Sequence, residues 1–312
     1  MASRVVLVTG VADQLGGQLA ARLAADPAID RVLGVDVTPG PGPRDARVEF
    51  VRADIRGPRI AKVIDSARVD TVVHAAPRPS VGPRRAAIKE LNVIGTMRLL
   101  SACQRADSVR KLVVKSTAEV YGASASSPAV FTEQDAPEQG HADEVEVEGY
   151  VRGFARRRPD VELTVIRLAE VIGPGVDNAL ARYFSLPVVP TVLGFDARVQ
   201  LLHVNDALAV LNRAATHHLP GVFNAGGDGV LMLSQAIRRA GRVPLPLPRA
   251  AIGFGTRLAG RVDLSPGQAR LLSYGRVIDT TRLKTTFGFT PKWTTAAAFD
   301  DYVHGRSATA RF

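Results

Sequence analysis

A glycine-rich turn near the N-terminus is the first part of this sequence whose residue types and spacing predict a chemical task. Residues 9–16 read TGVADQLG and begin at the end of an apolar segment of strand length, residues 4–9. Gly10 permits a tight turn, and Gly16 lets a helix pack closely on the strand, so that free N–H groups at the helix N-terminus can bind a pyrophosphate. The spacing predicts a dinucleotide-binding turn with contacts from Gly10, Ala12, Asp13, Gln14, Leu15 and Gly16.

A carboxylate further along the chain bears on the choice of dinucleotide. Asp36 lies 20 residues beyond Gly16, within the second apolar segment. A carboxylate there accepts hydrogen bonds from the ribose hydroxyls and repels a 2′-phosphate, which favours NAD(H). Arg44, in the loop that follows, is able to pair with a 2′-phosphate, so NADP(H) stays open. The predicted cofactor is therefore NAD(H) or NADP(H).

These residues need a scaffold, and the pattern of apolar segments predicts one. Segments rich in β-branched residues, almost continuous in hydrophobicity as in strands buried on both faces, occupy residues 4–9, 32–37, 48–52, 71–74, 111–115 and 163–167. Helical spacing lies between them, at residues 16–25, 60–67, 86–105 and 144–158. This alternation predicts an α/β fold with a doubly wound, Rossmann-type parallel sheet.

The character of the chain changes after Gly173 and Pro174. Prolines become dense and apolar segments shorten, which predicts a smaller substrate lobe. We expect a dinucleotide-binding domain over residues 1–173, to which 198–226 returns, and a lobe built from 174–197 and 227–312. Many apolar residues at 188–195 and 245–258 suit either a flat, hydrophobic ligand or the core of this lobe.

Several short motifs, in order along the chain, carry a family resemblance. They read ADI at 53–55, HAA at 74–76, NVIGT at 92–96, STAEVYG at 116–122, RLAEVIGP at 167–174, HVND at 203–206 and FNAG at 223–226. With them the chain resembles the extended short-chain dehydrogenase/reductases, the NAD-dependent epimerase/dehydratase family. The resemblance implies further cofactor contacts from Asp54, Ile55, Ala75, Ala76, Pro77, Asn92, Lys115, Ser116, Leu168 and Ala169.

The sequence departs from the family pattern at the cofactor turn and at the catalytic pair. The family's middle glycine falls on Asp13, which is expected to cap the first helix and point away from the cofactor. The family's Tyr-x-x-x-Lys pair is absent from the whole chain. With Glu148 aligned on the helix's usual glutamate, the tyrosine and lysine positions fall on Gly140 and Glu144.

Three hydroxyl residues on the STAEVYG segment are the remaining catalytic candidates. Thr117 matches the family's Ser/Thr, which hydrogen-bonds the oxygen of the carbonyl or alcohol being converted. Ser116 is a second candidate and is expected to meet the cofactor. Tyr121 is a third and is expected chiefly to be structural.

The substrate position also departs from the family. Glu170 stands where relatives acting on nucleotide sugars place an asparagine against the diphosphate, and a carboxylate there is unfavourable. The triplet at 117–119 is Thr-Ala-Glu, without the aspartate of the sugar dehydratases. Both departures count against a nucleotide-sugar substrate.

These departures favour an NAD(P)H-dependent ketoreductase as the leading hypothesis. Its substrate is a small hydrophobic ketone, such as a phenolic polyketide, that supplies its own proton, as expected for the atypical angucyclinone-type ketoreductases of antibiotic biosynthesis that also lack the tyrosine. One alternative is a nucleotide-sugar epimerase or dehydratase. Another is a non-catalytic NAD(P)-binding sensor or scaffold.

The amino-acid composition argues against several other kinds of site and partner. Cys103 is the only cysteine, which excludes an internal disulfide and a paired-cysteine metal site, and no metal is expected. The net charge of +10 comes from dispersed arginines without interleaved aromatic residues, so nucleic acid is not an expected partner. No apolar run reaches the roughly 18 residues of a membrane span. We expect a cytoplasmic protein with a small-molecule substrate and a homodimer as one option for its assembly.

Overall fold

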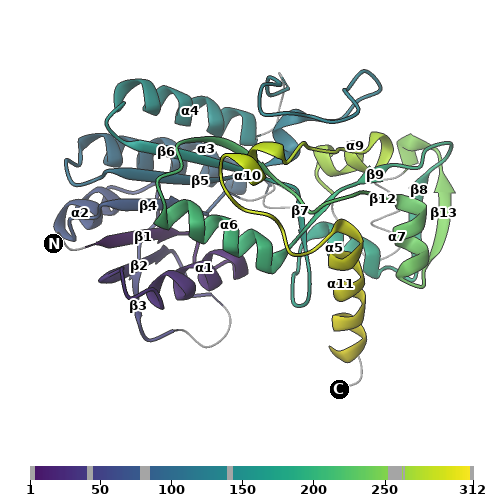
Figure 1. Ribbon diagram of the computed structural model, residues 1–312, viewed down its shortest axis with the longest axis horizontal. Helices are drawn as coiled ribbons and strands as arrows, with labels where there is room; N and C mark the ends of the chain where they lie inside the picture. The colour runs from purple at the N-terminus through teal and green to yellow at the C-terminus, as the bar shows by residue number, and fades with distance from the viewer. Residues whose placement is uncertain are drawn as a thin grey trace.

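The computed structural model describes residues 4–40, 45–77, 85–138, 143–251, 262 and 264–309. Arg44 and Gly140, named above, lie outside these residues, as does part of the apolar segment 245–258. Figure 1 shows two parts side by side, a broad sheet covered by helices and a smaller group of short strands and helices. The predicted cofactor residues belong to the first part.

The sheet of the larger part has seven parallel strands and confirms the predicted α/β, Rossmann-type fold class. Its strand order is β11-β6-β5-β4-β1-β2-β3, which reverses between β1 and β4 as in doubly wound sheets. The strands are β1 (Val5–Thr9), β2 (Arg31–Asp36), β3 (Val48–Arg52), β4 (Thr71–His74), β5 (Lys111–Thr117), β6 (Glu162–Leu168) and β11 (Gly221–Ala225).

The first six strands lie where the apolar segments predict them, whereas β11 is not among the predicted strands. It pairs in parallel with β6 over five residues and forms one edge of the sheet. Its sequence, GVFNA, begins with glycine and contains a buried Asn224, so its hydrophobic run is too short to mark a strand.

Helices cover both faces of this sheet because alternate residues of each strand point to opposite sides. Val6 and Val8 of β1 pack in one core with α1 (Gln14–Ala24) and α6 (Val204–Thr216). Val5 and Leu7 pack in a second core, on the other face. The helices of that face are α2 (Arg59–Ser66), α3 (Arg85–Arg105) and α4 (Asp143–Arg157).

The smaller part has its own core and several two-stranded pairings. Its core gathers Tyr183, Phe184 and Phe299 among other buried apolar residues. Its helices are α5 (Ala179–Ser185), α7 (Leu233–Arg239), α9 (Pro266–Tyr274) and α11 (Thr295–Thr309), whereas α10 (Thr281–Thr285) packs against β11 of the large sheet through the buried Leu283. Its strands are β7 (Glu170–Ile172) with β10 (Leu201–His203), β9 (Arg198–Val199) with β12 (Leu231–Met232), and β8 (Val188–Val192) with β13 (Val243–Leu247).

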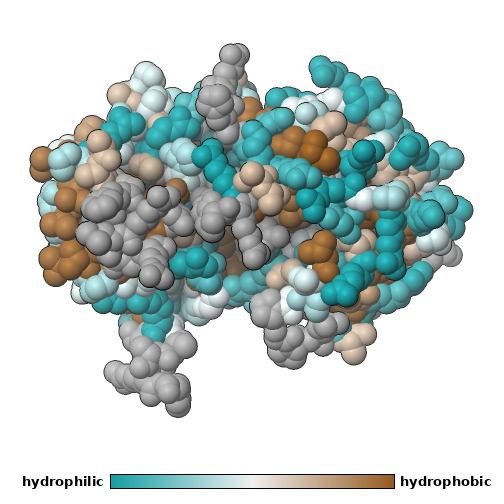
Figure 2. Space-filling model, turned by 180° about the vertical axis from the view of Figure 1, so that it is seen from behind, coloured by the Kyte–Doolittle hydropathy of each residue, from teal (hydrophilic) through white to brown (hydrophobic). Residues whose placement is uncertain are grey.

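Hydrophobic surface gathers at the left edge of Figure 2, the end of the molecule that holds the β8–β13 pair in Figure 1. Val188, Val243 and Leu245 of this pair are exposed, as are Leu193 and Phe195 beside it. Much of the apolar segment 188–195 is therefore surface, although Val189 and Val192 are buried in the core. Within the described ranges, no helix has the length and apolar character needed to cross a bilayer.

The tight packing of α1 on β1 gives a stability prediction. A Cβ added at Gly16 would collide with the carbonyl oxygen of Gly10, whereas one at Gly149 in α4 meets nothing closer than Arg152 Nη2 at 4.0 Å. We expect Gly16→Ala to lower the free energy of unfolding by about 1–3 kcal/mol because backbone must move. Gly149→Ala, the matched control, should raise it by about 0.5–1 kcal/mol. Urea unfolding of both variants checks this, and an unchanged midpoint for Gly16→Ala would contradict it.

Candidate functional site

The turn between β1 and α1 is pressed against the end of β4. Gly10 has a φ of +79°, which favours glycine, and a Cβ there would lie 2.6 Å from the Cα of Ala76. Gly16 sits over the Gly10 carbonyl with equally little room. The N-terminus of α1 is therefore held at the carboxyl edge of the sheet, where its free N–H groups can meet a pyrophosphate.

Asp36 lies beside this turn, at the end of β2. One carboxylate oxygen accepts a hydrogen bond from the backbone N–H of Ala12 at 3.0 Å, and the other accepts one from Val37 at 2.7 Å. The structure thus brings the predicted ribose-binding residue to the glycine-rich turn. Asp13 occupies the N-cap position of α1, as expected, but its side chain makes no capping hydrogen bond.

The other predicted cofactor residues follow the ends of neighbouring strands. Ala75, Ala76 and Pro77 come after β4, Lys115 and Ser116 lie in β5, and Leu168 and Ala169 end β6. After β3, Asp54 forms an ion pair with Arg56 at 2.6 Å, which lowers the pKa of Asp54. Ile55 is buried, and only a glycine at position 95 of α3 leaves room for it. Asn92 of α3 donates to Asp143 of α4.

A buried histidine fixes the end of β4 between β1 and α3. His74 Nδ1 is 2.8 Å from the hydroxyl of Thr9, and Nε2 is 2.8 Å from that of Thr96. Burial, with a smaller effect of Lys115, lowers the pKa of His74 to about 3, so the ring is neutral. This structural contact across the sheet was not foreseen from the HAA motif.

A buried ion pair joins α4 to β6 and engages two of the three catalytic candidates. Arg167 donates to Glu148 with Nε at 2.9 Å and Nη2 at 2.6 Å. Ser116 Oγ donates to the same carboxylate at 2.7 Å. The Tyr121 hydroxyl accepts from Arg167 Nη1 at 2.8 Å and donates to Asn224 Oδ1 at 2.7 Å. Both hydroxyls have protein partners, which fits structural roles.

Thr117 differs from Ser116 and Tyr121 in that its hydroxyl still has a proton with which it can donate a hydrogen bond. Its Oγ1 accepts a hydrogen bond from the backbone N–H of Glu119 at 3.2 Å, at the start of the short helix η2 (Ala118–Tyr121). A hydroxyl that accepts still has its own proton to donate. Its side chain is partly exposed, whereas Ser116 and Tyr121 are buried. Of the three candidates, Thr117 is the one whose hydroxyl can donate to a substrate oxygen.

Next to Thr117 lies a group of carboxyls whose proximity the sequence motifs do not predict. We call Glu119, Glu144 and Glu170, with the buried Arg276, the carboxyl cluster. Glu119 accepts a hydrogen bond from Ser265 Oγ at 2.8 Å. It also packs on Gly267 in the first turn of α9, where any Cβ would collide with its carboxylate. Arg276 Nε donates to the carbonyl of Gly122 at 2.9 Å.

Burial and mutual repulsion shift the ionisation of this cluster. Burial, followed by the charge of Glu119, raises the pKa of Glu144 to about 8. The same two causes raise the pKa of Glu170 to about 7, with Arg276 opposing them. Although Glu170 is only partly buried as a residue, its carboxyl lies among protein atoms. Near neutral pH Glu144 is therefore mostly protonated and Glu170 is partly protonated, which their ordinary pKa values would not predict.

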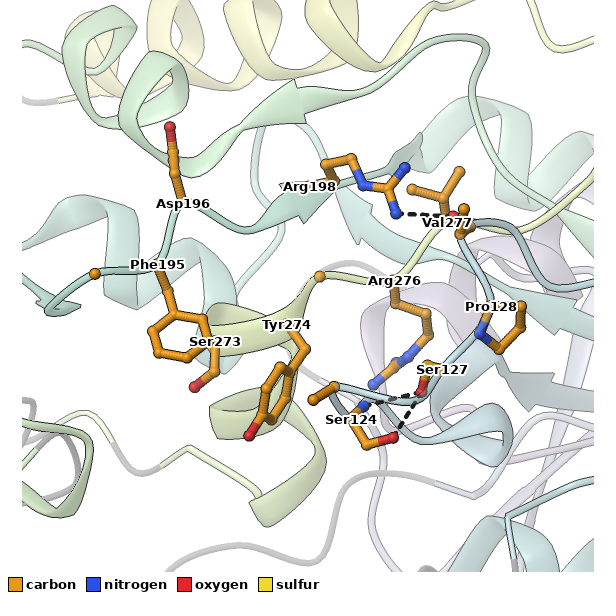
Figure 3. Close-up of a pocket in the computed structure, with 14 residues that line it drawn as sticks. Ser124, Ser127, Pro128, Phe195, Asp196, Arg198, Ser273, Tyr274, Arg276 and Val277 are labelled. Carbon is orange, nitrogen blue, oxygen red and sulfur yellow. Dashed lines mark hydrogen bonds between the residues drawn. The ribbon is translucent and has the colours of Figure 1, made fainter.

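A hollow opens beside Arg276, the cation of the carboxyl cluster (Figure 3). Its volume is about 330 Å³, and it lies among three segments, residues 124–129, 194–198 and 273–277. Arg276 lines it and also faces the three glutamates, so this side chain connects the hollow with the cluster. The described residues contain no group of three or more His, Cys, Asp or Glu side chains placed to hold a metal ion.

The buried ion pair gives a second stability prediction. Removing the Arg167 guanidinium leaves Glu148, only 3% exposed, without its bidentate partner and with only the longer contact to the exposed Arg152 at 3.6 Å among the described ion pairs. We expect Arg167→Met to lower the free energy of unfolding by about 3–5 kcal/mol. Arg239→Met, which breaks the exposed pair with Asp300, should lower it by no more than about 1 kcal/mol. Chemical denaturation measures both, and equal losses would show that the buried charge is neutralised in another way.

The raised pKa of Glu144 predicts a pH-dependent stability. In the unfolded chain this carboxyl ionises near 4.5 and in the native protein near 8, so raising the pH between these values favours unfolding. Glu144→Gln removes this effect. We expect the free energy of unfolding of the variant, relative to that of the wild type, to rise between about pH 5 and about pH 8, by on the order of a few kcal/mol. Above about pH 8 the difference between the two proteins should stay constant.

The exposed Glu146 on the same helix provides the control for this measurement. The curve of Glu146→Gln should run parallel to that of the wild type over the whole pH range. If Glu144→Gln also gives a parallel curve, the carboxyl of Glu144 ionises normally and the charge assignment of the cluster is wrong.

Comparisons with known proteins agree with this architecture. The model of the NAD dependent epimerase/dehydratase family matches residues 6–226. Rv0501, an uncharacterized protein of Mycobacterium tuberculosis (strain ATCC 25618 / H37Rv), is 52% identical over 98% of this chain and 85% of its own length. UDP-glucose 4-epimerase 2 of Oryza sativa subsp. japonica is 26% identical over 78% of this chain and 71% of its own.

Among solved structures, MoeE5 in complex with UDP-glucuronic acid and NAD has a TM-score of 0.76 at 21% identity, covering 98% of this chain and 100% of that one. At this identity the likeness shows a shared fold. The family match spans more than half of the sequence and confirms the resemblance drawn from the motifs. The chain belongs to the NAD-dependent epimerase/dehydratase family.

Proposed function

We propose that this protein is an NAD-dependent enzyme that oxidises a hydroxyl group of a nucleotide sugar, as the first step of an epimerisation or dehydration. The observation that carries the proposal is the alignment of three strand ends along one sheet edge. Parallel pairing places Thr9 of β1 beside His74 of β4, and His74 beside Val114 of β5. The cofactor turn and Thr117 consequently lie at the same carboxyl edge, where ligands of open α/β sheets bind.

The residues at this edge fit a nicotinamide dinucleotide. The close packing at Gly10 and Gly16 leaves the helix N-terminus open to a pyrophosphate, and Asp36 is held where ribose hydroxyls would bond it. When bound, NAD supplies the electron acceptor for oxidation of a carbon that bears a hydroxyl. The negative charge of Asp36 favours NAD(H) over NADP(H).

The chain's own part is to bind and orient the reacting oxygen. Thr117 donates a hydrogen bond to that oxygen, since its Oγ1 accepts from the N–H of Glu119 and keeps its own O–H to donate. The rigid network around Glu148 keeps β5 in place, because Ser116 is bonded to it one residue earlier. A hydroxyl fixed in this way aligns the substrate, and alignment contributes much of an enzyme's rate.

Two points support a nucleotide sugar over the hydrophobic ketone. The relatives described above include a UDP-glucose 4-epimerase and a protein solved with UDP-glucuronic acid and NAD, and none of their names indicates polyketide reduction. The objection that Glu170 repels a diphosphate is weakened, because its pKa is raised to about 7 and Arg276 lies beside it. The missing tyrosine and the Thr-Ala-Glu triplet at 117–119 remain as support for the ketoreductase hypothesis.

The test measures cofactor binding first and turnover second. Titration with NADH and NADPH, followed by nicotinamide fluorescence, should show tighter binding of NADH. Incubation with NAD+ and UDP-glucose, UDP-glucuronic acid or dTDP-glucose should then yield an epimer or a keto sugar by NMR. We expect Thr117→Val to lower kcat by about 100-fold, as for the loss of one oriented hydrogen-bond donor, without weakening NADH binding.

Ser127→Ala, a change in a hydroxyl at the rim of the hollow, is the matched control and should retain most of the activity. Reduction of a phenolic ketone without turnover of any nucleotide sugar would favour the ketoreductase. Tight NADH binding with no turnover of either class would favour the sensor or scaffold.

A further inference from the structure

We propose that Glu144 is the group that exchanges a proton with the reacting oxygen of the substrate. The inference rests on the proposed function for the identity of that oxygen and on the geometry of α4 for the residue. In this proposal a carboxyl on α4 carries out the proton transfer that a tyrosine performs in the family pattern and that no tyrosine of this kind can perform here.

The first step is that the usual proton carriers near Thr117 are committed elsewhere. The hydroxyls of Ser116 and Tyr121 bond Glu148, Arg167 and Asn224. The ring nitrogens of His74 are both bonded to threonine hydroxyls. The hydroxyl of Thr117 can donate a hydrogen bond, but an alkyl hydroxyl does not release its proton near neutral pH.

The second step is the position of Glu144 on α4. Glu144 and Glu148 are four residues apart, so they share one face of the helix. Glu148 reaches Ser116 at 2.7 Å, and Glu144 lies about 6 Å nearer the helix N-terminus, given the helical rise per residue. Because α4 follows β5 and packs against η2, this direction leads from Ser116 towards Thr117 and Glu119. The electrostatic influence of Glu119 on Glu144 agrees with that placement.

The third step is that the Glu144 carboxyl is largely buried and, among the described residues, is hydrogen-bonded only to its own backbone. The residue is only 8% exposed, yet its side chain has no hydrogen bond to another residue of the described ranges, its own backbone N–H being its one such contact. Buried polar groups are almost always hydrogen-bonded, so a carboxyl of this kind is suited to a ligand's hydroxyl. Glu148, one turn away, shows the opposite state, with three donors on it.

The surrounding charges are arranged to let Glu144 gain and lose a proton. Glu119 faces it from η2, bonded to Ser265 and lying at the N-terminus of α9, where a helix dipole favours negative charge. On its own helix, Asp143 adds a smaller repulsion and is itself contacted from α3 by Asn92 and Lys89. The opposing positive charge is Arg276, while Glu170 of β7 lies across the cluster beside the same Glu119 and Arg276. A proton affinity near neutrality is the one that general acid–base catalysis requires.

The proposed step balances as follows. The O–H and C–H bonds of the substrate's carbinol break and a C=O bond forms. The hydroxyl proton goes to the Glu144 carboxylate, and the hydrogen of the C–H bond leaves with both bonding electrons to reduce NAD+ to NADH. Glu144 returns the proton when the carbonyl is reduced again. The positive charge of NAD+ favours the ionised carboxylate that the oxidation needs.

The effect of the NAD+ charge on the ionisation of Glu144 can be measured without turnover of a substrate. Proton release into a weakly buffered solution, measured with a pH indicator near pH 7.5, should accompany NAD+ binding to the wild type and be much smaller on NADH binding. Glu144→Gln should abolish the extra release while binding NADH with nearly unchanged affinity. Glu146→Gln, an exposed change on the same helix, should release protons like the wild type.

A second experiment measures kcat and its pH dependence for the same variants. Glu144→Gln should lower kcat at least 100-fold, the range expected for loss of a general acid–base group, and remove the pH dependence of the oxidation step between about pH 6 and 9. Glu144→Asp should recover part of the rate with a shifted pH profile. If the glutamine variant fails to fold, Glu144→Asp serves alone, and its proton release should shift in pH.

The outcomes separate this inference from the proposed function. Unchanged proton release in Glu144→Gln, or a wild-type pH profile with more than a tenth of the rate, would overturn the role of Glu144. Weakened NADH binding with unchanged kcat would also overturn it, since Glu144 would then only bind the cofactor. If no nucleotide sugar is turned over, the proposed function fails, whereas loss of proton release in the variant would still support Glu144.

Discussion

The ion pair between Arg167 and Glu148 is the interaction on which the site depends. It joins the middle of α4 to the end of β6, and the same two side chains hold Ser116 of β5 and Tyr121 of η2. Two buried charges are tolerated here because nearly every donor and acceptor is used. By fixing how α4 is rotated on the sheet, the pair also places Glu144, one turn away on the same helix face, on the buried side of the helix.

Glu144 and Glu148 show how environment, and not residue type, assigns a role to a carboxyl. Glu148 has a guanidinium and a hydroxyl on it and acts as a structural anion. Glu144 is also buried, but the largest charge effect on it comes from another carboxylate, Glu119, so its pKa is raised and it holds a proton. A buried carboxyl with a raised pKa, such as Glu144, is typical of acid–base sites.

The sequence predicts the cofactor half of the molecule well because its signals are local. A strand, two glycines and Asp36 fall within residues 4–36, and each has a direct structural meaning. Strand β11 escapes prediction because its pairing with β6 supplies what its short sequence lacks. The carboxyl cluster could not be predicted, since Glu119, Glu170 and Arg276 meet only after folding and their ionisation depends on burial. The family residues that are missing from the sequence therefore favour a ketoreductase, whereas the proposed proton carrier, Glu144, is recognised only from the folded structure.

The contact between Glu119 and the first turn of α9 has one more consequence. Glu119 belongs to the sheet's part of the molecule, whereas Ser265 and Gly267 belong to the helix that packs over it. The carboxyl cluster is therefore assembled from both parts, and its affinity for protons is a property of their docking. Any change that strengthens or weakens the contact between Glu119 and α9 therefore alters the proton affinity of the cluster. By thermodynamic reciprocity, protonation of the cluster in turn alters the strength of that contact.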